Sequence, residues 1–107
     1  MTITMDPGYF YGDAVGDMNM AVGWSDNCYS YRDFKVTPKF ALTNTPHSTS
    51  MRAPGCMQSI LASEVVLERI AKAVNKPLEE VQALNFYQLE QHPVTPFGDH
   101  LGKDGYN

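Results

Sequence analysis

A single arginine lies in the part of this chain that is best suited to holding an anionic ligand. Arg52 belongs to the segment 43–58, which has neither helical nor strand periodicity and is followed by an apolar helical pattern. Met51 precedes the arginine and an Ala-Pro-Gly tripeptide follows it. A fixed cation and backbone donors at a helix entrance can bind an anion, but such an arginine can also bond neighbouring carbonyls and hold the loop. The residue types leave both interpretations open.

Three histidines and three N-terminal aspartates offer metal ligands or acid–base groups. They are His47, His92 and His100, and Asp13, Asp17 and Asp26. The histidines are too far apart in sequence for a recognisable metal motif, so we expect each to be an ordinary polar loop residue. The aspartates could gather carboxylates, but a solvated acidic loop is the simpler interpretation. Residues 12–16 lack the spacing and the lysine of a phosphate-binding loop.

Composition and charge narrow the classes of protein. The chain has 107 residues, 43% of them hydrophobic and 19% charged, which indicates one domain at most with a packed core. A net charge of −4 argues against nucleic acid or an anionic membrane as partner. No apolar run approaches the roughly 18 residues that span a bilayer, and no signal-peptide pattern opens the chain. Cys28 and Cys56 are too few for a secreted disulfide scaffold, so we expect two buried thiols in a cytoplasmic protein.

Hydrophobic periodicity predicts an α+β fold. Short strands are predicted within residues 8–42, most clearly over 34–42, where apolar residues alternate with Lys and Thr. Pro38 removes a donor from that strand and predicts an edge position or a bulge. After the long loop, apolar stripes predict helices over about 59–74 and 77–87, followed by a loop tail.

The N-terminal part is less regular. The apolar run from Met18 to Trp24 fits either a buried strand or a short helix, because the window is short. Three glycines suggest turns between short extended pieces: Gly8, Gly12 and Gly16. The opening Met-Thr-Ile-Thr-Met resembles a translation leader left from cloning more than a structural element. Residues 1–7 are therefore left out of the fold prediction, which treats residues 8–107 as a single unit.

Several short motifs form an ordered set along the chain. They are Asp26-Asn27-Cys28-Tyr29, Val36-Thr37, Thr43-Asn44-Thr45-Pro46, Met51-Arg52-Ala53-Pro54-Gly55 with Gln58, Glu79 to Tyr87, and Thr95-Pro96-Phe97. Their order and spacing resemble a stretch of the molybdenum hydroxylases, the family of aldehyde oxidases and xanthine dehydrogenases. The resemblance covers about residues 8–101 and implies a fragment of the molybdopterin-binding portion.

The resemblance assigns roles to four residues. Arg52 matches the arginine whose backbone amide lies beside the molybdenum centre, and Met51 takes the neighbouring position on the cofactor side. Pro54 stands where xanthine dehydrogenases usually place a phenylalanine that packs against the substrate ring. Met20, six residues before Asp26, stands where they carry an arginine that binds the purine. A methionine there removes a cation and leaves a deformable apolar wall, which favours an aldehyde oxidase-like pocket.

The resemblance also implies parts that lie outside this chain. Family members carry 2Fe-2S clusters and usually FAD elsewhere in the protein, and they use a glutamate base that no glutamate here matches. We therefore expect a fragment that is inactive alone, with the remainder of a molybdenum hydroxylase as partner, and that self-associates through exposed apolar surface. The alternative is a stand-alone, non-catalytic binding or interaction module with the same fold.

Overall fold

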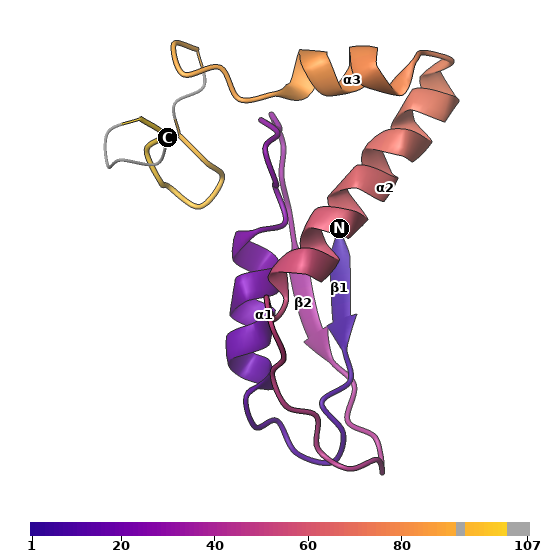
Figure 1. Ribbon diagram of the computed structural model, residues 1–107, viewed down its shortest axis with the longest axis vertical. Coiled ribbons are helices and arrows are strands. Elements are labelled where there is room, and N and C mark those ends of the chain that lie inside the picture. The colour runs from indigo at the N-terminus through magenta and orange to yellow at the C-terminus, as the bar shows by residue number, and fades with distance from the viewer. Residues whose placement is uncertain (92–93, 103–107) are drawn as a thin grey trace. The chain divides into compact units, whose positions relative to one another are not determined.

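The computed structural model describes residues 1–91 and 94–102 of the chain and has an α+β fold, as predicted (Figure 1). Within these residues the elements are, in chain order, β1 (Thr2–Met5), α1 (Ala14–Gly23), β2 (Thr37–Phe40), α2 (Cys56–Val74) and α3 (Leu78–Asn85). They form two compact units. The first comprises residues 1–25 and 35–61, and the second comprises residues 26–34 together with the described residues from 62 onward.

The first unit contains a two-stranded parallel sheet. β1 pairs with β2 so that Thr2 lies opposite Thr37 and Met5 lies opposite Phe40. α1 lies in the connection between the strands and contacts β1. Because β2 has one partner strand in the described part of the chain, Pro38 lies in an edge strand, as predicted. The strand is shorter than the predicted segment 34–42.

The opening residues, which the fold prediction left out, contain a strand of this fold. Thr2–Met5 alternates polar and apolar residues, and the structure exposes the threonines while Ile3 and Met5 are half-buried. Pro7 is buried just beyond the strand. Because this segment resembles a translation leader, its alternation of polar and apolar residues was not interpreted as a strand.

The run from Met18 to Trp24 is mostly helical, because it falls largely within α1. The buried residues of α1 are Ala14, Met18 and Ala21, which share one helical face. The prediction that Gly16 marks a turn between extended pieces is wrong, since Gly16 lies inside this helix. A seven-residue window holds too few turns to distinguish the helical period from the strand period.

The second unit contains α2 from residue 62 onward, together with α3. α2 begins three residues before its predicted start, and α3 lies within the predicted range with Pro77 as its N-cap. α2 ends where Asn75 takes a φ of 53° and the Lys76 N–H donates to the Ala71 carbonyl, the hydrogen bond of a Schellman motif. The core of this unit comprises Tyr29, Leu67, Ala71 and Val81.

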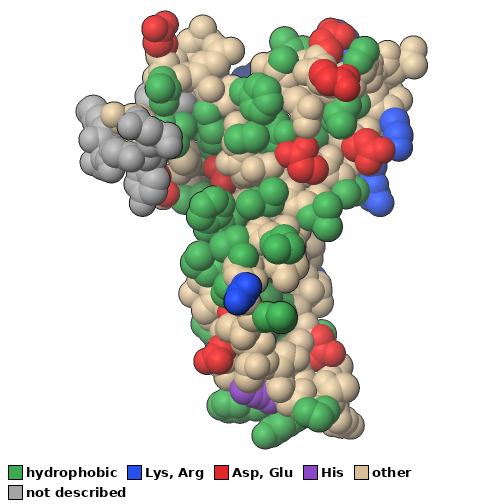
Figure 2. Space-filling model, viewed as in Figure 1, with side chains coloured by type: hydrophobic (Ala, Val, Ile, Leu, Met, Phe, Trp, Pro, Cys, Tyr) green, Lys and Arg blue, Asp and Glu red, His purple; other side chains and the backbone are tan. Residues whose placement is uncertain are grey.

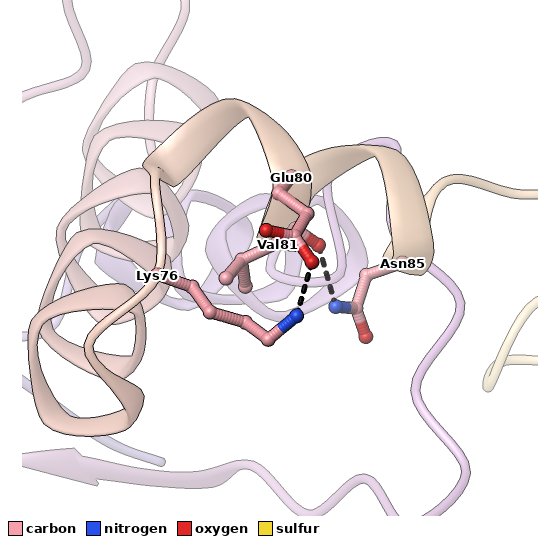
Figure 3. Close-up of polar contacts among 4 residues, drawn as sticks. All are labelled: Lys76, Glu80, Val81 and Asn85. Atoms are coloured by element: carbon pink, nitrogen blue, oxygen red, sulfur yellow. Dashed lines mark hydrogen bonds and ion pairs between the residues drawn. The ribbon is translucent and has the colours of Figure 1, made fainter.

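Two local contacts stabilise the ends of α3 (Figure 3). Lys76 pairs with Glu80 one turn later, and Asn85 Nδ2 donates to the Val81 carbonyl at 2.7 Å. The described tail holds an isolated bridge between Val94 and His100, in keeping with a loop. His92 lies outside the described residues. None of the helices in the described ranges has the length and apolar character needed to cross a bilayer.

Candidate functional site

The segment between β2 and α2, residues 41–55, presents Arg52 to solvent. Arg52 is exposed, and the neighbouring Met51 is 82% exposed. The salt bridges in the described part of the chain lie at α2 and α3 and do not include this arginine. Among the described residues, the backbone N–H groups of Met51 and Arg52 also donate to no protein acceptor. The turn therefore offers a cation and two backbone donors to a ligand.

The turn is packed against α1 on both sides of Arg52. Ser50 Oγ donates to Asp17 Oδ1 at 2.5 Å, and Ser59 Oγ donates to the Ala21 carbonyl at 2.6 Å. Gly55 has a φ of 73°, and a Cβ at this position would lie 2.1 Å from the Asp17 carbonyl oxygen and 2.7 Å from the Ala21 nitrogen. The loop thus meets the helix backbone to backbone, which only glycine permits.

The same packing gathers the segments that carry the four residues singled out from the sequence. Met20 lies next to Ala21 on α1 and is 42% exposed, while Pro54 is half-buried next to Gly55. Arg52 and Met51 lie in the same turn, and all four belong to the first unit. The structure brings the two segments together, and the roles of these residues toward a ligand stay predictions.

A polar cluster in the second unit was missed by the sequence prediction. Glu64 of α2 accepts two hydrogen bonds on Oε1, from Asn27 Nδ2 at 2.8 Å and from Tyr29 OH at 2.7 Å. Gln82 Nε2 donates to Oε2 at 2.9 Å. The signal was present, since Asn27 and Tyr29 share one motif of the resemblance and Gln82 belongs to another.

Asp26 is buried, so the expectation of a solvated acidic loop is wrong for this residue. It is 5% exposed, and Tyr87 OH donates to its Oδ2 at 2.6 Å. Burial raises the pKa of the Asp26 carboxyl, and the hydrogen bond from Tyr87 partly opposes that rise. Burial also raises the pKa of the Tyr29 and Tyr87 phenols above the ordinary value. The hydrogen bonds of Glu64 and Asp26 therefore join residues 26–29 to α2, to α3 and to Tyr87 within the second unit.

Comparison with known proteins identifies the family. Residues 1–86 match the model of the molybdopterin cofactor-binding domain. The chain belongs to this family. Xanthine dehydrogenase of Dictyostelium discoideum is 29% identical over 83 residues, and xanthine dehydrogenase/oxidase of Felis catus is 32% identical over 84 residues. Each alignment covers 78% of this chain and 6% of the relative, so the chain spans a small part of their length. The resemblance to the molybdenum hydroxylases is confirmed.

An aldehyde oxidase is also among the relatives of this molybdopterin cofactor-binding domain. Indole-3-acetaldehyde oxidase of Zea mays is 29% identical over 75 residues, which cover 70% of this chain and 6% of that protein. The donors of the Arg52 turn fit the family's cofactor, because molybdopterin carries an anionic phosphate and a guanidinium with adjacent backbone N–H groups binds such anions. The assignment of Arg52 and Met51 to this cofactor stays a prediction.

The two cysteines differ in their exposure to solvent. Cys56 is half-buried, but Cys28 is exposed, which corrects the expectation of two buried thiols. Cys28 lies at the end of the turn that precedes the buried bridge residue Tyr29, and this turn leaves its thiol exposed. No group of three or more metal-ligating side chains occurs among the described residues.

The raised tyrosine pKa values predict that the molybdopterin cofactor-binding domain loses stability in alkali. Tyr29 and Tyr87 keep their protons in the folded state above the unfolded pKa of about 10. Their contribution is therefore complete below that pKa and is lost as pH rises above it. We expect the free energy of unfolding, measured in urea, to fall by ~1–3 kcal/mol between about pH 9 and about pH 11.

A double variant provides the control for this pH dependence. Tyr29→Phe with Tyr87→Phe removes both phenols and should flatten the alkaline fall, although the variant starts from a lower stability. An equal fall in the native chain and in the double variant would show that other groups cause it.

Proposed function

We propose that this domain contributes the Arg52 turn to the molybdopterin and substrate pocket of a larger oxidoreductase of the aldehyde oxidase or xanthine dehydrogenase type. The proposal is supported by the Arg52 side chain and the N–H groups of Met51 and Arg52, which have no hydrogen-bond partner among the described residues. They lie on a turn that packs against α1. In this proposal the Arg52 guanidinium and N–H bind and orient the anionic cofactor, and Met51 covers it on the apolar side.

The substrate side of the proposed pocket is apolar. Met20 and Pro54 place a thioether and a ring where a cation and an aromatic ring occur in xanthine dehydrogenases, so the wall suits aldehydes or apolar heterocycles. When bound, the cofactor supplies hydroxylation at a carbon–hydrogen bond, with 2Fe-2S clusters and FAD elsewhere in the parent protein accepting the electrons. No glutamate of this chain matches the family's base. We therefore propose that the domain binds and positions the cofactor but does not convert substrate by itself.

Exposed apolar residues on α2 support association with the remainder of such an enzyme. In the second unit Val65, Val66, Ile70 and Val74 are 36–52% exposed. Figure 2 shows hydrophobic side chains spread over the drawn face of the molecule. The relatives extend far beyond the aligned segment. We propose that the corresponding additional residues of the parent enzyme pack against this apolar surface. Without it, we propose that the chain self-associates. Its free cysteines are in keeping with a cytoplasmic, reducing compartment.

Cofactor content tests the proposal. The full chain is produced in a host that makes molybdopterin, and bound pterin and molybdenum are measured by fluorescence after oxidation and by elemental analysis. Arg52→Ala should lower both by about tenfold or more, because it removes a hydrogen bond to a charged group. Arg69→Ala, an exposed arginine on α2, is the matched control and should leave both unchanged. Equal contents in both variants would favour the alternative of a non-catalytic interaction module.

A further inference from the structure

Asp17 of α1 contacts both ends of the turn that presents Arg52. Its carboxylate accepts the Ser50 hydroxyl at 2.5 Å, two residues before the arginine. Its backbone carbonyl lies so close to Gly55, three residues after the arginine, that a Cβ there would be 2.1 Å away. One residue of the helix therefore lies against both ends of a six-residue segment.

The segment between these two contacts depends on outside support. Ala53 has a φ of 53° and Gly55 a φ of 73°, so the chain reverses through two residues in the left-handed region. Alanine reaches that region at a conformational cost, and such residues persist when their surroundings hold them. Among the described residues, the N–H groups of Met51 and Arg52 have no hydrogen-bond partner. The support of the segment therefore lies at its two ends, where Ser50 bonds Asp17 and Gly55 closely approaches the α1 backbone.

We propose that Asp17 is a positioning residue for the Arg52 donors. The carboxylate holds Ser50, the turn follows, and Arg52 is presented in one conformation rather than many, which lowers the entropic cost of binding an anion. Met20 lies three residues after Asp17 on the same helix. In this proposal Asp17 therefore also determines how Met20, on the substrate side of the pocket, is placed relative to Arg52 on the cofactor side. The inference about ligand binding rests on the proposed function, whereas the ordering of the turn does not.

Trypsin cleavage of the full native chain measures this ordering without any cofactor. The Arg52–Ala53 bond is cut only when the turn opens, and the rate is taken relative to cleavage at Arg32 by mass spectrometry. Asp17→Ala should speed the relative cleavage at Arg52 by about tenfold, because the hydroxyl of Ser50 then loses its charged acceptor. Asp17→Asn keeps an acceptor oxygen and should restore slow cleavage.

Two further variants separate positioning from general weakening. Asp13→Ala is the matched control, because Asp13 is exposed, stands just before α1 and makes no side-chain cap bond. It should leave the Arg52 cleavage rate unchanged. Ser50→Ala should match Asp17→Ala, and the double variant should be no faster than either. Equal acceleration at Arg32 and Arg52, or native-like cleavage in Asp17→Ala, would overturn the proposal.

Cofactor content then tests the link to binding separately. Asp17→Ala should lower bound pterin about as much as Arg52→Ala does, with Asp13→Ala and Asp17→Asn close to native. If cleavage speeds up while pterin falls in Arg52→Ala but not in Asp17→Ala, the positioning role is wrong and the proposed function stands. If no variant changes pterin content, the proposed function fails, although the ordering of the turn by Asp17 holds.

Discussion

Substitution of Gly55 by alanine should unfold the first unit of the domain or leave it severely destabilised. The added Cβ would lie 2.1 Å from the Asp17 carbonyl oxygen and 2.7 Å from the Ala21 nitrogen, and both atoms belong to the α1 backbone. Neither can move without displacing the helix, and the φ of 73° adds the cost of a left-handed conformation. We expect a loss of ~3 kcal/mol or more in the free energy of unfolding, measured by urea denaturation followed by circular dichroism.

Gly16 provides a control of opposite sign on the same helix. It lies inside α1, and a Cβ there would meet nothing within 4 Å. Gly16→Ala should therefore stabilise the domain by ~0.5–1 kcal/mol through the helix propensity of alanine. A Gly55→Ala variant as stable as the native chain would contradict the close packing of the turn on α1.

Removal of the Glu64 carboxylate should have the second large effect, in the second unit. Asn27, Tyr29 and Gln82 all donate to this group, and Tyr29 is 1% exposed, so Glu64→Ala leaves donors without an acceptor in a place that water reaches poorly. An unsatisfied buried donor costs ~1–3 kcal/mol, and loss of a whole cluster costs more than one. We expect ~3 kcal/mol of destabilisation in the same urea experiment.

Glu68 is the matched control for this variant. It lies one turn later on α2 and forms an exposed i,i+4 pair with Lys72. Exposed pairs of this kind contribute little, so Glu68→Ala should barely change the unfolding midpoint. Similar midpoints for Glu64→Ala and Glu68→Ala would show that the cluster around Glu64 does not stabilise the second unit.

The helices of the second half were predictable because their information is local. The apolar stripe of α2 and the Asn-Lys-Pro sequence after it determine where the helix runs and stops, and the structure places its end at Val74 as predicted. The predicted start was three residues late, because Cys56, Met57 and Gln58 precede the clear stripe. The end of α2 is marked by residue type, whereas its start directly follows Gly55, which packs closely on α1.

The candidate site was only partly accessible from the sequence. The residue types around Arg52 left a structural role and a ligand-binding role open, and the family resemblance singled out the binding role. The support of the turn by Asp17 could not be predicted, because it joins residues 33 apart in the chain. The cluster around Glu64 could not be predicted for the same reason, because helical periodicity describes spacing within α2 and carries no information on contacts with Asn27 or Gln82.

Pterin bound per chain, measured in the native protein and in Arg52→Ala and Arg69→Ala variants, tests the central claim most directly. The claim is that the Arg52 turn provides donors to a molybdopterin site. We predict equal pterin in the native chain and Arg69→Ala, and about a tenth of that amount in Arg52→Ala. Equal pterin in all three proteins, or none bound by the native chain, would contradict the claim.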